Sequence, residues 1–105
     1  MLVQINTDNR VEGNEVANAA IEERLRERLS RFADRLTRVE VHVRDVDGDR
    51  NGGQGIAVSL EARPAGGQPI AVNDQAATVD SAVAGALRKA VDILDRSFAK
   101  QDAVR

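Results

Sequence analysis

The sequence predicts an α+β two-layer sandwich, in which a four-stranded sheet carries both helices on one face in the order β-α-β-β-β-α. Two observations indicate this fold class. Apolar residues alternate with polar ones in four short segments, and they recur with the helical period in two longer ones. Each strand segment is apolar on one side only, and two amphipathic helices are the elements available to cover that side.

The first strand and the first helix are predicted for residues 2–6 and 14–36. In the strand, Val3 and Ile5 alternate with polar residues. A turn-rich stretch follows, after which Asn14 can cap a helix whose apolar residues recur at steps of 4, 4, 3 and 4. These residues share the face that should meet the core: Ile21, Leu25, Leu29, Phe32 and Leu36.

Three more strands and a second helix are predicted in the rest of the chain. The strands are expected at residues 39–43, 56–62 and 69–73, with turn-rich segments between them that suit antiparallel hairpins. After residue 77 the period is helical again, and the core face is formed by Val83, Leu87, Val91, Leu94 and Phe98. Because a helix joins the first two strands, they should be parallel neighbours with a right-handed crossover, and the remaining pairs antiparallel.

Composition limits the kind of protein. With 105 residues and 42% hydrophobic content, residues 1–105 should form one domain with one core. The sequence has no cysteine, which excludes disulfides and thiolate metal sites, and no segment typical of a signal peptide or a membrane span. We expect a soluble, cytoplasmic protein. The net charge of −2 argues against general affinity for nucleic acid, so any contact with RNA must be local.

Charged residues sort onto separate faces of the first predicted helix. The basic stripe is Arg24, Arg28, Arg31 and Arg35, and the acidic one is Glu23, Glu27 and Asp34. A row of guanidinium groups suits repeated phosphates, because each planar fork can bond two oxygens at once. The alternative is an ordinary solvated face stabilised by i,i+4 pairs, of Glu22 with Arg26 and of Glu27 with Arg31.

Residues suited to catalysis or metal binding are few. The single histidine, His42, is expected mid-strand on the polar side, as an ordinary surface residue. The first half of a calcium loop is matched by Asp47, Asp49, Asn51 and Gly52, but position 12 of that loop is Val58 where a bidentate glutamate is required. We therefore expect no enzymatic activity, no cofactor and no metal site.

Four stretches of sequence carry a resemblance that covers nearly the whole chain. They are LVQINTDNRVEG, RFADRLTRVEVHVRD, SLEARPAGGQPIAV and TVDSAVAGAL. In their order they resemble the ribosome hibernation promoting factor and RaiA family of ribosome-associated translation inhibitors. The resemblance implies the same β-α-β-β-β-α fold. The chain is similar to the short, single-domain form, without the dimerisation domain of the long forms.

The resemblance also implies a partner and a site. In that family, basic residues on both helices contact small-subunit ribosomal RNA in the channel for messenger and transfer RNA, so that translation is blocked in resting cells. Carried over to this chain, the RNA-binding residues are Arg24, Arg28, Arg31 and Arg35 on the first helix and Lys89, Arg96 and Lys100 on the second. The second helix is less basic than is typical, with Gly85, Val91 and Asp92 at places where basic residues would be expected.

Two functions from different classes remain open at this point. The first is a non-enzymatic translation regulator whose partner is the small ribosomal subunit and its rRNA, with no membrane and no small-molecule substrate. The alternative is a small protein-protein interaction module with no RNA role, which would pair through the polar sheet face or the edge of the fourth strand. A weak homodimer is compatible with both.

Overall fold

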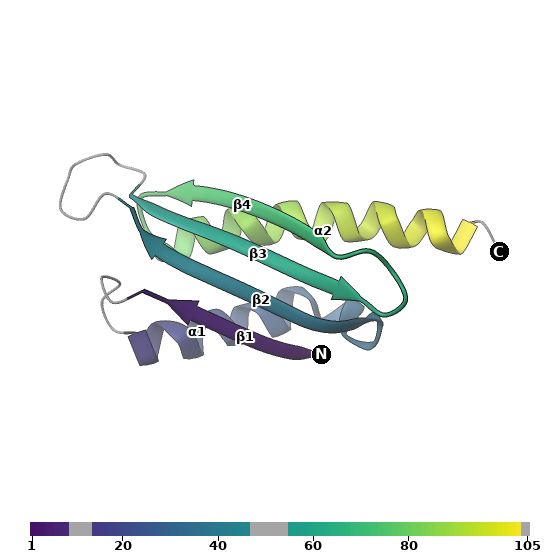
Figure 1. Cartoon of the computed structure of the whole chain (residues 1–105), viewed down its shortest axis with the longest axis horizontal. Coiled ribbons are helices and arrows are strands. Elements are labelled where there is room, and N and C mark those ends of the chain that lie inside the picture. The colour runs from purple at the N-terminus through teal and green to yellow at the C-terminus, as the bar shows by residue number, and fades with distance from the viewer. Residues whose placement is uncertain (9–13, 47–54, 104–105) are drawn as a thin grey trace.

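The computed structural model describes residues 1–8, 14–46 and 55–103, and its elements follow the predicted order (Figure 1). The strands are β1 (Leu2–Thr7), β2 (Leu36–Asp45), β3 (Ile56–Pro64) and β4 (Ile70–Ala76). The helices are α1 (Asn14–Arg28), the short 3₁₀ helix η1 (Ser30–Arg35) and α2 (Val79–Ala103). Both long helices lie on the same face of the sheet, so the predicted fold class is confirmed.

The four strands pair in the order β1-β2-β3-β4. Strands β1 and β2 are parallel, with Val3 opposite Val39. The two following pairs are antiparallel, with Leu60 opposite Val41 on one side and opposite Val72 on the other. The predicted strand directions are therefore confirmed, and β1 and β4 form the edges of the sheet.

The core is one apolar layer between the sheet and the two long helices. On β2 it includes Val39, Val41 and Val43, which are at most 1% exposed, and on α2 it includes Leu87 and Leu94, which are fully buried. Each such side chain stabilises the folded state by about 1.5–3 kcal/mol. Because this layer uses one face of every element, the faces left for function are the outer sheet surface and the outer surfaces of the helices.

The prediction of one helix over residues 14–36 is wrong in its last third. Helix α1 ends at Arg28, and the chain then tightens into η1, where the N–H of Phe32 donates to the carbonyl of Leu29 at 2.9 Å. Strand β2 begins directly at Leu36. The tighter winding, with its i to i+3 bonds, buries both Phe32 and Leu36 and lets the strand begin without a loop.

Strand β4 extends past its predicted end and places an aspartate on the side that faces α2. A Cβ atom on Gly85 would lie only 2.1 Å from Oδ2 of Asp74, so the carboxylate occupies the space that a side chain would need. Nζ of Lys89, one turn further along α2, pairs with Asp74 Oδ1 at 3.0 Å. Gly85 thus forms a buried contact between α2 and β4, where Asp74 leaves no room for a side chain.

The substitution Gly85→Ala tests this contact. In the wild-type background the new methyl group displaces the Asp74 carboxylate, so the free energy of unfolding should fall by about 1–3 kcal/mol. In the D74A background the same substitution should raise it by about 0.5–1 kcal/mol, since glycine destabilises a helix relative to alanine. Urea unfolding of the four proteins gives both values, and equal effects in the two backgrounds would contradict the contact.

Candidate nucleic-acid interface

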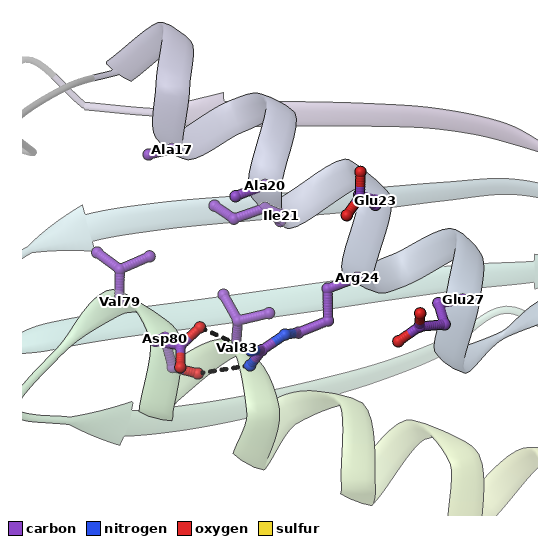
Figure 2. A pocket seen from close by; sticks show the side chains of 9 residues that line it. All are labelled: Ala17, Ala20, Ile21, Glu23, Arg24, Glu27, Val79, Asp80 and Val83. Carbon is purple, nitrogen blue, oxygen red and sulfur yellow. Dashed lines mark hydrogen bonds and ion pairs between the residues drawn. The ribbon is translucent and has the colours of Figure 1, made fainter.

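Three of the four arginines in the predicted stripe reach across to α2, where each pairs with an aspartate. The distances are 2.9 Å for Arg24 Nη2 to Asp80 Oδ1, 2.6 Å for Arg31 Nη1 to Asp95 Oδ1, and 3.2 Å for Arg35 Nη2 to Asp102 Oδ1. We call these three pairs the interhelical ladder. Figure 2 shows its first rung, where the Arg24 guanidinium also donates to the Asp80 carbonyl at 3.4 Å. Helices α1 and α2 run in the same direction (Figure 1), so the arginines of α1 and η1 meet the aspartates of α2 in chain order.

Two aromatic rings support the last two rungs of the ladder. The central guanidinium carbon of Arg31 lies 4.5 Å from the centre of the Phe32 ring, and that of Arg35 lies 3.9 Å from the centre of the Phe98 ring. The two rings contact each other with their centres 5.7 Å apart. A planar guanidinium group stacks well on an aromatic face. Each of these arginines is therefore oriented by a ring on one side and by a carboxylate at its end.

The Arg31 and Asp95 side chains form a bidentate pair, with a second contact of 2.7 Å from Nη2 to Oδ2. The hydrogen bond from Arg31 lowers the pKa of Asp95 below its ordinary value, and the same bond raises the pKa of Arg31. Both groups therefore keep their charges at neutral pH. The i,i+4 pair of Glu22 with Arg26 is confirmed at 3.0 Å, whereas Arg31 binds Asp95 and not Glu27.

The arginines of the ladder still present donors to solvent. The side chain of Arg31 is 58% exposed although it is paired, and a guanidinium group carries five N–H donors, of which the bidentate contact uses two. Arg28, the fourth arginine of the predicted stripe, is exposed and makes no ion pair or hydrogen bond with any described residue. The four arginines of the predicted stripe are thus one unpaired guanidinium group, that of Arg28, and three whose charge is largely balanced by aspartates of α2.

The basic residues predicted on the second helix lie along the other edge of α2, toward β4. Lys89 Nζ pairs with Asp74 and also donates to the carbonyl of Asn73 at 2.6 Å. Arg96 pairs within the helix, with Asp92 at 2.8 Å. Lys100 is exposed and has no such partner among the described residues. The two predicted groups therefore flank α2 on opposite sides, and the structure does not gather them into one patch.

The acidic half of the ladder was not predicted from the sequence. Asp80, Asp95 and Asp102 are separated by 15 and 7 residues, which is close to four and two turns of an α-helix. This spacing places the three carboxylates on one side of α2. The spacing of these aspartates was therefore a signal in the sequence. The helical period that predicts the core face of α2 also predicts this acidic face.

The other candidate sites were the calcium-like segment and His42, and neither forms a metal site within the part of the chain that the structure describes. In residues 1–8, 14–46 and 55–103, no three acidic or histidine side chains are close enough to hold a metal ion. Most of the calcium-like segment, residues 47–54, lies outside the described residues. His42 is exposed on the outer sheet face, with Nε2 at 3.7 Å from Glu40 Oε2. No helix among the described residues is long and apolar enough to cross a membrane.

Comparison with known proteins gives the family. Residues 3–102 match the family model described as sigma 54 modulation protein / S30EA ribosomal protein. The chain belongs to this family. The residues of the interhelical ladder lie within the matched segment, which includes α1 and η1 and all but the last residue of α2. No curated protein matches the chain.

Solved structures share the fold of this S30EA-family protein at low sequence identity. The N-terminal domain of Thermus thermophilus Protein Y superposes with a TM-score of 0.70 at 18% identity, covering 91% of this chain and 98% of that one. A ribosomal subunit interface protein from Coxiella burnetii superposes with a TM-score of 0.69 at 16% identity, covering 94% and 99%. The fold predicted from the resemblance is thus shared along almost the whole of both structures.

The acid titration of Asp95 provides a test of the ladder. Because the folded-state pKa of Asp95 is lowered, its pairing stabilises the protein above the unfolded pKa of about 3.9 and is lost as the pH falls through the folded value. The D95N variant should therefore melt below the wild type at pH 7, and this difference should shrink as the pH falls below the unfolded pKa and through the lowered folded-state value. Melting curves over that pH range measure it.

The matched control for D95N is D92N, because the Asp92 pair with Arg96 stays within one helix and both of its side chains are mostly exposed. Its effect on the melting temperature should be much smaller. A D95N deficit that persists unchanged into acid would contradict an electrostatic role for the ladder.

Proposed function

We propose that this S30EA-family protein is a non-enzymatic translation regulator that binds the small ribosomal subunit in its channel for messenger and transfer RNA. Family membership over residues 3–102 is the observation that carries this proposal. The name of the Coxiella burnetii neighbour, a ribosomal subunit interface protein, agrees with such a role. The protein would act in the cytoplasm, where ribosomes translate.

The proposed contacts are made by basic residues of the helix layer with phosphates of the ribosomal RNA. They are Arg24, Arg28, Arg31 and Arg35 on the first helical segment and Lys89, Arg96 and Lys100 on α2. The unpaired Arg28 and Lys100 supply full charges, whereas the ladder arginines supply directed N–H donors with their charge already balanced. Such a donor stabilises a bound phosphate only when the phosphate lies in line with the N–H group. In other positions the neighbouring carboxylate repels the phosphate.

The proposed inhibition is steric. A protein whose longest dimension is 51 Å, seated through its helix layer, excludes the RNA strands that use the same channel. No bond is made or broken, so the proposal needs neither a catalytic residue nor a cofactor. It predicts that inhibition follows occupancy of the small subunit.

Charge reversal at Arg28 and Lys100, the two residues of the proposed site that have no partner among the described residues, tests the site with least risk to the fold. The R28E/K100E variant should co-sediment with small subunits at least about tenfold more weakly, as expected when two phosphate contacts are lost. Its melting temperature should stay close to that of the wild type, since neither side chain has an internal partner among the described residues.

The matched control for R28E/K100E is R44E/R63E, which changes the net charge equally but alters the outer sheet face. This control should bind nearly as well as the wild type. Equal loss of binding in both variants would mean that net charge alone determines binding. Unchanged binding in both variants would contradict the proposed site.

Salt dependence separates the proposal from the protein-interaction alternative. Phosphate contacts release counterions, so the logarithm of the binding constant should fall with the logarithm of salt concentration, with a slope of about −3 to −6 for four to seven contacts. Gradient sedimentation with small subunits over a range of salt concentrations measures the slope. Binding that does not depend on salt would favour a protein-protein interface with no RNA role.

A further inference from the structure

A groove lies between residues 17–27 of α1 and the beginning of α2 (Figure 2). It has a volume of about 440 Å³. Its floor is aliphatic and is formed by Ile21, Val79 and Val83, while Ala17 and Ala20 form the wall on the α1 side. The groove stays open because these alanines are too small to reach α2, in contrast to the other end of the helices, where Phe32 and Phe98 are in contact.

The apolar surface continues out of the groove along α1. Ala20 is exposed, and Val16, one turn before it, is 78% exposed. Residues four apart are neighbours on a helix surface, so these two side chains form one strip beside the groove. An aliphatic side chain of this exposure is not required by the core, and it extends the surface on which a partner could pack.

The rim of the groove is acidic and its charge is not balanced from within. Glu23 and Glu27 lie on the rim, and neither forms an ion pair with any described residue. The one basic lining residue, Arg24, is already bound to Asp80. By contrast, each of the four aspartates of α2 described here has a basic partner: Asp80, Asp92, Asp95 and Asp102. The groove therefore carries three carboxylates against one guanidinium group.

We propose that this groove binds an extended segment of a partner protein that presents an aliphatic side chain followed by arginine or lysine. The aliphatic side chain would pack on Ile21, Val79 and Val83, and the basic one would pair with Glu23 and Glu27. From Ala20 to Glu27 the helix rises about 10 Å, which an extended chain spans in about three residues. The rim at Glu23 and Glu27 does not suit RNA, because unpaired carboxylates repel phosphates.

This inference goes beyond the proposed ribosomal function and does not depend on it. The outer surface of the two helices then has two parts that would bind ligands of opposite charge. The part around Arg28, Arg31 and Arg35 offers donors to anions, whereas the groove around Glu23 and Glu27 offers acceptors to cations. A protein that contacts RNA through one part would retain a separate surface for a basic protein segment.

A labelled peptide tests the groove without ribosomes. The probe is the fluorescein-labelled peptide GSLISSRRSG, in which two aliphatic residues precede two arginines by about the required distance. Fluorescence anisotropy should show saturable binding to the full chain. In NMR spectra of labelled protein, the amide signals that shift should include those of Ala17, Ala20 and Val83. Peptides with both arginines changed to glutamate, or with leucine and isoleucine changed to serine, should bind at least about tenfold more weakly.

Matched protein variants make the test specific. E23Q/E27Q should weaken binding of the probe on the order of tenfold. D34N/D92N removes the same total charge outside the groove and should leave binding within about twofold, with circular dichroism confirming that both variants fold. The proposal is overturned by absence of binding at millimolar probe, by equal effects of the two variants, or by shifts that map to another surface. Tighter binding of a ten-residue uridine oligonucleotide to the groove residues would also overturn it.

Discussion

The structure depends on one constraint, which is that two helices must share the single apolar face of a four-stranded sheet. Helix α2 lies close to the sheet because Ala82, Ala86 and Ala90, which face it, are small and fully buried. Within the described residues, no polar or charged side chain is buried. Most charges are therefore left on the outer sheet face, on the outer helix surfaces, or along the seam where the two helices meet, and Asp74 lies at the margin between β4 and α2.

The seam between the helices contains both apolar contacts and ion pairs. Its two ends differ because the side chains between the helices are large at one end and small at the other. At one end Phe32 and Phe98 fill the space between the helical segments, so arginines can stack on the rings and reach the aspartates beyond. At the other end the alanines of α1 leave the space open, and one pair, Arg24 with Asp80, crosses it. Interhelical pairing and an acidic groove are thus consequences of the same arrangement of helices.

The sequence was sufficient for the fold because strand alternation and helical period are local signals. They predicted six main elements in the right order, the strand directions and most of the core. The failures came where a distant contact overrides the local pattern. The turn at Phe32 follows from its burial against α2 and the sheet, and the role of Gly85 is visible only once Asp74 is placed opposite it. The rungs of the ladder join residues 56 to 67 positions apart, which no local period reveals.

The internal pairing of the arginines bears on how an acidic chain could recognise RNA. With a net charge of −2, the protein has little long-range attraction for a polyanion, so electrostatic steering contributes little. A guanidinium group held by a ring and a carboxylate loses net charge but keeps directed donors and little freedom to move. The affinity of such groups for RNA depends more on a fixed arrangement of phosphates than on the density of phosphates. A folded ribosomal RNA surface offers such an arrangement, whereas a flexible single strand does not, which favours one site on a large assembly over the many RNAs that compete for it.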